Sequence, residues 1–188
     1  MPTWLLILII AGAVVVIAAL AVVVNSRRTT ARLKQRYGAE YQRLQSEHGD
    51  HRAAEKELTD RERNRDKLDI VALTPSAFTH FTHRWQQAQL AFVDDPTVAV
   101  AAADRLITDV MRERGYPVDA FEQRAADISV DHPHIVENYR AAHAIHLAQL
   151  DGHVDTEKQR EAFVYYRALF ESLLETNDDN ETSQEATA

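Results

Sequence analysis

The chain has 188 residues, of which 45% are hydrophobic and 27% are charged, with a formal net charge of −8 and no cysteine. The lack of cysteine excludes a disulfide scaffold, a thiolate zinc site and a cysteine nucleophile. Five glycines and five prolines exclude a collagen-like or Gly/Pro-rich chain.

The N-terminal segment is the most apolar part of the chain. Residues 4–24 carry no charged side chain, and about 20 apolar helical residues span the core of a bilayer. A cleaved signal peptide has a basic start and a shorter apolar core, and here no basic residue precedes the apolar run. We therefore predict that residues 1–25 are a retained transmembrane helix of a single-pass protein in the inner (plasma) membrane.

Basic side chains follow this predicted anchor before the first acidic residue, and they are Arg27, Arg28, Arg32, Lys34 and Arg36. Basic residues close to a membrane span stay on the cytoplasmic side, so the soluble domain is expected to face the cytoplasm. The five side chains are also well placed to contact anionic lipid headgroups. The alternative is that they only set the topology.

Residues 26–70 are predicted to form a basic juxtamembrane and charged helical stalk. Residues 26–48 continue the membrane helix and carry Leu33, Tyr37, Tyr41 and Leu44 at helical spacing. Residues 51–68 are dominated by charges of both signs three or four positions apart, and such pairs support a helix only weakly. A solvated stalk is the simpler interpretation, and a weak coiled coil in a homodimer is the alternative, although the apolar heptads are not sustained.

Residues 71–175 are predicted to be a compact antiparallel helical bundle, which makes the protein all-α with about five helices in this domain. Thr74-Pro75 and Asp95-Pro96 have the pattern of an N-cap followed by proline at the first helical position. Gly115 is expected to end the second helix. Further helices are expected over 118–128, 131–150 and 156–175, the last opened by a capping box of Thr156 and Gln159.

Apolar residues repeat at spacings of three and four in this domain, as one buried face of a helix requires. Such stripes are formed by Phe78, Phe81, Trp85, Ala88 and Phe92, by Val100, Ala103, Ile107 and Val110, and by Phe163, Tyr166, Phe170 and Leu173. Residues 176–188 have no apolar side chain larger than alanine, so we expect a disordered acidic tail.

The body of the protein is acidic, because residues 71–188 carry 9 basic and 20 acidic side chains, a balance of −11. Such a surface repels phosphate groups, and nucleic acid is therefore not an expected partner.

Histidine is the residue that most suggests chemistry. His80 and His83 are three positions apart, and so are His143 and His146. His80 and His83 fall on either side of the apolar stripe of their helix, so we expect them to face solvent. In the helix expected over 131–150 the apolar stripe consists of Val136, Tyr139, His143, Leu147 and Leu150. His143 therefore falls within the stripe, and His146 lies at its edge. A four-histidine zinc site is therefore disfavoured, and a buried neutral His143 hydrogen-bonded to Tyr139 or Tyr166 is the simpler interpretation.

A second polar group lies near one turn and consists of Asp127, Asp131, His132 and His134. Capping and solvation explain it more simply than catalysis. The sequence does not contain the Glu-x-x-His spacing of di-iron bundles. It also contains no Gly-rich phosphate loop and no nucleophile motif. No catalytic residue and no cofactor are assigned, and the candidate metal ligands are His132, His134, His143 and His146.

Four stretches of sequence carry a resemblance: residues 36–41, 49–55, 92–96 and 114–133. They resemble an uncharacterised family of bacterial single-pass membrane proteins with no assigned activity, which implies the same architecture and contributes no catalytic residue. The sequence thus favours a membrane-tethered, non-enzymatic helical interaction or scaffold module with an unknown protein partner. The alternative is a metal-binding or hydrolytic helical domain that uses the Asp131/His132/His134 turn or His143.

Overall fold

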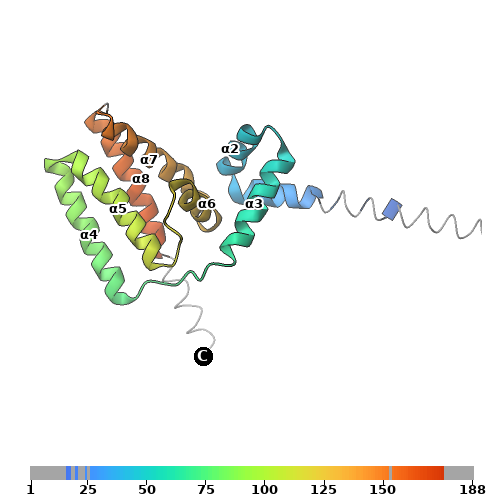
Figure 1. The fold of residues 1–188 in the computed structure, drawn as a ribbon, viewed down its shortest axis with the longest axis horizontal. Coiled ribbons are helices and arrows are strands. Elements are labelled where there is room, and N and C mark those ends of the chain that lie inside the picture. Colours follow the sequence, from blue (N-terminus) through green and yellow to red (C-terminus); the bar gives the residue numbers. More distant parts are fainter. Residues whose placement is uncertain (1–15, 18–19, 21–23, 25, 153, 176–188) are drawn as a thin grey trace, which may run out of the picture. The chain divides into compact units, whose positions relative to one another are not determined.

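The computed structural model describes residues 16–17, 20, 24, 26–152 and 154–175. All the regular elements of these residues are α-helices (Figure 1), which confirms the all-α class. Residues 26–37 are helical. The helices that follow are α2 (Ala39–His48), α3 (His51–Arg65), α4 (Pro75–Asp94), α5 (Pro96–Glu113), α6 (Phe121–Asp131), α7 (Val136–Leu150) and α8 (Thr156–Glu175).

Two predicted segments fall outside this description. The transmembrane anchor at residues 1–25 lies almost entirely outside the described residues, and the acidic tail at 176–188 lies wholly outside them. Among the helices that are described, none is both long enough and apolar enough to cross a membrane. The anchor and the disordered tail therefore stay predictions.

The chain divides into two compact units, Met1–Leu58 and Thr59–Ala188. The division falls inside α3, whereas the sequence placed it at residue 70. Each unit has its own hydrophobic core among the described residues.

The first unit is a helical hairpin rather than an extended rod. Gly38, with φ +49°, interrupts the helix that was expected to run unbroken over 26–48, and Gly49, with φ +65°, ends α2. The core contains Leu33, Tyr37, Tyr41, Leu44, Ala54 and Leu58, each at most 2% exposed. The apolar side chains that a coiled-coil seam would use are therefore buried against α3 of the same chain.

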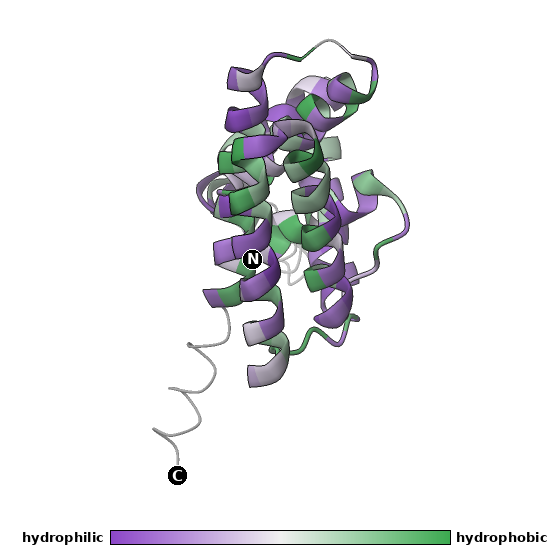
Figure 2. Cartoon of the chain, turned by 90° about the vertical axis from the view of Figure 1, so that its left-hand side faces the viewer, coloured by the Kyte–Doolittle hydropathy of each residue, from purple (hydrophilic) through white to green (hydrophobic). Residues whose placement is uncertain are grey.

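The second unit is built around α5, which packs against α4, α7 and α8, while α7 also packs against α6. Seven residues of α5 are buried: Ala99, Val100, Ala103, Leu106, Ile107, Val110 and Met111. Figure 2 shows hydrophilic and hydrophobic residues alternating along the helices, as expected when each helix buries one face.

Local capping explains where several helices begin. The Thr74 hydroxyl accepts a hydrogen bond from Ala77 N at 3.2 Å, and the Asp95 carboxylate accepts one from Val98 N at 3.1 Å. Both predicted helix starts are thus confirmed.

The start of α8 differs from the prediction, because Asp155 supplies the cap by accepting from Lys158 N at 2.8 Å. Gln159, expected to complete a capping box with Thr156, instead donates to Thr97 Oγ1 and Gln149 Oε1. It is 6% exposed and links the start of α8 to α5 and α7. The Gln159 side chain therefore makes tertiary contacts instead of capping its own helix.

Candidate binding groove

The four histidines that the sequence offered as metal ligands do not converge on one point. His132 is buried at the end of α6, His134 is exposed in the turn after it, and His143 and His146 lie on α7. Across the described residues no group of three or more His, Asp or Glu side chains is arranged to hold a metal ion. His80 and His83 are both exposed, as predicted.

His132 is held by a hydrogen bond rather than by a cluster of ligands. Its Nδ1 lies 2.7 Å from Ser172 Oγ, while its Nε2 is buried without a hydrogen-bond partner. Burial lowers the pKa of His132 because it disfavours the imidazolium form. The ring is therefore neutral at pH 7, and it joins the end of α6 to α8.

Asp131 accepts hydrogen bonds from two side chains, those of Arg65 and Tyr116. Arg65 Nε donates to both of its carboxylate oxygens, at 2.8 and 2.9 Å, and the Tyr116 hydroxyl donates to Oδ2 at 2.5 Å. Burial, and then the bond to Asp131, raises the pKa of Tyr116 far above its ordinary value. These contacts tie α3 and the loop after α5 to α6, which is a structural role.

Asp127, the other carboxylate of the predicted cluster, has a different hydrogen-bond partner from Asp131. It accepts from Gln123 Nε2 at 2.9 Å, and its second oxygen is buried without a partner. Burial raises its pKa. The predicted group of Asp127, Asp131, His132 and His134 is thus not assembled as one site.

His143 is bonded to a residue that the sequence did not single out. Its Nδ1 donates to Asp104 Oδ1 at 3.3 Å, and the Tyr166 hydroxyl donates to the same oxygen at 2.8 Å. The imidazole also stacks on the Phe121 ring, with centroids 3.7 Å apart. The expected polar partner is therefore present, but it is Asp104, with Tyr166 sharing the acceptor.

The helical phase predicted for α7 is only partly right. The His143 side chain is 14% exposed, but Leu147 and Leu150, assigned to the same stripe, are 50% and 69% exposed. The buried residues of α7 are Val136, Tyr139 and Ala142. The predicted stripe is therefore right at Val136 and Tyr139, but the next buried residue is Ala142 rather than His143, and burial does not extend to the end of the helix.

The Asp104 carboxylate leads to a prediction about pH. Burial alone would raise its pKa, but the hydrogen bonds from His143 and Tyr166 outweigh that effect and lower it. A carboxyl whose pKa is lower in the folded chain stabilises the fold above its unfolded pKa, and loses that contribution as pH falls through the folded value. We expect Asp104→Asn to lower the free energy of unfolding at pH 7 and to lose much of that effect near pH 3.

Urea unfolding at the two pH values measures this. Asp119→Asn is the matched control, because Asp119 is exposed in the loop before α6, and it should show no such change. A difference between wild type and Asp104→Asn that is equal at both pH values would show that the ionised carboxylate contributes nothing.

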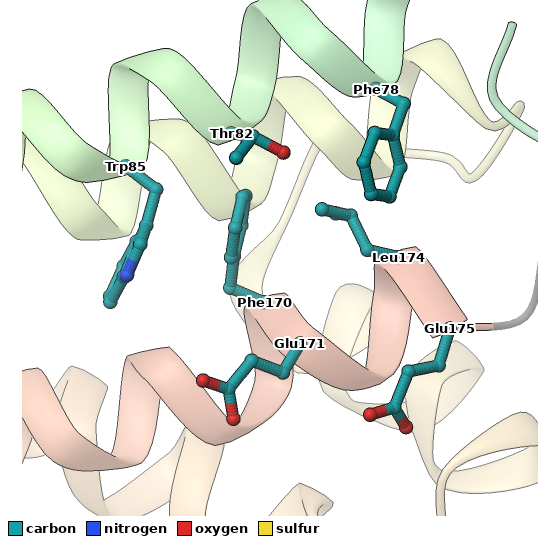
Figure 3. A pocket seen from close by; sticks show the side chains of 7 residues that line it. All are labelled: Phe78, Thr82, Trp85, Phe170, Glu171, Leu174 and Glu175. Atoms are coloured by element: carbon teal, nitrogen blue, oxygen red, sulfur yellow. The ribbon is translucent and has the colours of Figure 1, made fainter. Parts of the chain in front are cut away.

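An apolar groove lies between α4 and α8 (Figure 3). Its volume is about 310 Å³, and it is lined by Phe78, Thr82, Trp85, Phe170, Glu171, Leu174 and Glu175. In Figure 3 the rings of Phe78 and Phe170 and the side chain of Leu174 gather between the two helices. Glu171 and Glu175 line the groove from α8, and in Figure 3 their carboxylates point away from α4.

The groove exists because α4 and α8 both pack on α5 and are joined to each other mainly through aromatic side chains. The Trp85 indole stacks on Phe163 and on Phe170, with ring centroids 4.9 Å apart in each case. Toward the N-terminal end of α4 this bridging stops, and Phe78 is left 40% exposed although the sequence pattern placed it in the core stripe.

Comparisons with protein-family models, with curated proteins and with solved structures find no match to this chain.

Proposed function

We propose that the protein is a single-pass membrane protein whose helical bundle faces the cytoplasm and acts as a non-enzymatic interaction module. In this proposal the α4–α8 groove binds an amphipathic helix of a partner protein. Binding of an apolar helix face in a groove between helices is a recurring mode of recognition. The observation that carries the proposal is a groove in which Phe78, 40% exposed, lies beside the more deeply buried Trp85, Phe170 and Leu174.

The composition of the groove supports this proposal. Binding interfaces combine an apolar centre with a polar rim, and aromatic side chains are enriched among the residues that contribute most affinity. Here Phe78 supplies exposed aromatic surface beside the buried rings of Trp85 and Phe170, and Glu171 and Glu175 also line the groove. The second reading, a metal-binding or hydrolytic domain, has less support because Asp131, His132 and His143 are each engaged in hydrogen bonds within the bundle.

The membrane topology can be tested with reporters fused after Ala188. A reporter that works only in the cytoplasm should be active, because five basic residues follow the apolar segment and hold that side of the span inside. A reporter that works only outside the cytoplasm should be silent. A mature protein whose sequence starts near residue 22 would instead identify a cleaved signal peptide and contradict the anchor.

The groove can be tested with Trp85 as a built-in reporter. The chain has two tryptophans, so Trp4→Phe in the full chain leaves Trp85 as the sole source of indole fluorescence. The probes are two synthetic helices of about 18 residues, or five turns, with the same leucine stripe and a polar face of either lysine or glutamate. We expect at least one of them to give a saturable change in emission, because the indole forms part of the groove wall.

Two variants locate the effect. Phe78→Ser should weaken binding, because Phe78 lines the groove and its partial exposure allows replacement without loss of the fold. Leu90→Ser is the matched control, since Leu90 is on the same helix, is 74% exposed and does not line the groove. Absence of any emission change with either peptide, in a protein that is folded by circular dichroism, would contradict the proposed groove.

A further inference from the structure

A second hollow, on the neighbouring helices α4 and α5 (Figure 1), is rich in arginine. Its volume is about 400 Å³, and its lining consists of Arg84, Ala102, Arg105, Thr108, Asp109 and Arg112. We propose that this arginine hollow binds the phosphate group of a small phosphate monoester. The proposal is independent of the α4–α8 groove, because none of these residues lines that groove.

The arginine hollow combines one side of α5 with one side chain of α4. Ala102, Arg105, Asp109 and Arg112 follow one another at spacings of three and four, which places them on the same side of α5. Arg84 comes from the middle of α4, which packs against α5. Three cationic side chains from two helices therefore surround one hollow.

Asp109 holds two of the three guanidinium groups in place. Arg84 Nη2 donates to Asp109 Oδ2 at 2.8 Å, and Arg112 Nη1 donates to Oδ1 at 2.7 Å. Burial alone would raise the pKa of Asp109, but these two bonds outweigh that effect and lower it, so the carboxylate is ionised at pH 7. Each guanidinium has five N–H donors, and both arginines therefore keep donors for a ligand.

Arg105 gives the hollow a surplus of positive charge. It is exposed, and no hydrogen bond or ion pair joins it to another described residue. The lining therefore carries three positive charges against one negative charge. Elsewhere in the described part of residues 71–175, the basic side chains that are not buried each have a carboxylate partner, in the pairs Arg140–Glu122, Lys158–Glu161, Arg160–Glu157 and Arg167–Glu171.

Three guanidinium groups around one hollow suit a phosphate group better than a carboxylate. The planar fork of arginine matches phosphate oxygens, and arginine clusters are a recurring means of phosphate recognition. A phosphate monoester carries nearly two negative charges at pH 7, close to the surplus in the hollow. The acidic body of the protein repels a long polyanion, but exposed charges are largely screened beyond about 8 Å at physiological salt. A single phosphate therefore responds mainly to the three arginines.

A neighbouring hollow indicates what the rest of the ligand is. It has a volume of about 240 Å³, shares Arg84 and Ala102 with the arginine hollow, and is also lined by Gln87, Ala88, Ala91 and Leu106. Three of these residues are alanines, whose side chains end at Cβ and leave space over the two helices. A small apolar group attached to the phosphate therefore fits beside the arginines.

Calorimetric titration of the full chain in a neutral detergent tests the proposal with two probes of the same shape. At a pH near 8, phenyl phosphate carries two negative charges and phenyl sulfate carries one. We expect the phosphate to bind about tenfold or more tightly than the sulfate, because charged hydrogen bonds are strong and each factor of ten needs only about 1.4 kcal/mol.

Three variants locate the binding. Arg105→Gln should weaken binding of phenyl phosphate about tenfold, and it removes no hydrogen bond within the described chain. Arg160→Gln is the matched control, because Arg160 is exposed on α8 and lines neither hollow. Ala91→Leu should fill the neighbouring hollow, so that it weakens binding of phenyl phosphate and leaves binding of inorganic phosphate unchanged.

A water-soluble short-chain phosphatidic acid is the third probe, because a lipid headgroup is the other source of a phosphate monoester. Tighter binding of this lipid than of phenyl phosphate, lost in Arg105→Gln, would identify a lipid as the ligand. Weaker binding would identify a soluble molecule.

The remaining outcomes decide the proposal itself. Equal binding of phenyl phosphate and phenyl sulfate would overturn it, as would equal losses in Arg105→Gln and Arg160→Gln, or no binding of any probe at millimolar concentration. Binding of phenyl phosphate that Ala91→Leu leaves unchanged would overturn the placing of the apolar group. A phosphate preference that is lost in Arg105→Gln and kept in Arg160→Gln supports the site.

Discussion

Replacement of Trp85 by alanine should lower the free energy of unfolding by about 3–5 kcal/mol, the usual cost of removing a buried tryptophan. The indole is 5% exposed and stacks on Phe163 and Phe170. The truncation opens a cavity between α4 and α8 and removes two of the ring contacts that join them, while Phe92 keeps its contact with Phe163. Denaturant unfolding followed by circular dichroism measures the change.

The control for this prediction lies on the same helix. Leu90→Ala removes an apolar side chain that is 74% exposed, so the change should stay within about 0.5 kcal/mol. If Trp85→Ala cost less than about 1 kcal/mol, the stacking of Trp85 on α8 would contribute little to holding α4 in the bundle.

Gly115→Ala should produce the second large effect, a loss of about 2–5 kcal/mol. Gly115 follows α5 with φ +92°, where residues with a Cβ are strained. An added Cβ would lie 2.4 Å from the backbone oxygen of Asp69. The segment between α3 and α4 would have to move, and with it the hydrogen bond from Val71 N to Arg114 O, which measures 2.9 Å.

Gly152 provides a control with the same backbone conformation and no such contact. Its φ is +80°, and an added Cβ would meet nothing within 4 Å. Gly152→Ala should therefore cost only about 1–2 kcal/mol, the penalty for a left-handed alanine. Thermal melts of the two variants compare them, and equal losses would show that the contact with Asp69 has no energetic consequence.

The helix starts could be predicted from the sequence because capping is local. Thr74 and Asp95 each bond a backbone N–H only three residues ahead, so the residue type and the following proline carry the information. Asp104 could not be identified in the same way, since its partners His143 and Tyr166 are 39 and 62 residues away. Arg114, which donates to Leu173 O at 2.6 Å across 59 residues, was missed for the same reason.

The exposure of Phe78 shows that the spacing of apolar residues does not by itself predict burial. Phe78, Phe81 and Trp85 have equivalent places in one apolar stripe, yet Phe78 is far more exposed than the other two. Spacing predicts which face of α4 turns inward, but not whether a neighbouring helix continues far enough to cover it. Likewise Leu33 and Tyr37 indicated a helix, and the sequence alone did not show that α3 folds back over them.

The contacts at the end of α3 have a mechanical consequence. Arg65 Nε donates to both carboxylate oxygens of Asp131, and Val71 N donates to Arg114 O. Arg65 and Val71 both precede Pro75, the first residue of α4. Tension applied to the chain from its N-terminal side therefore meets these contacts, and the bond from Arg61 to Ser129, before it reaches α4. The groove between α4 and α8 is thus shielded from a pull on the chain that precedes α4.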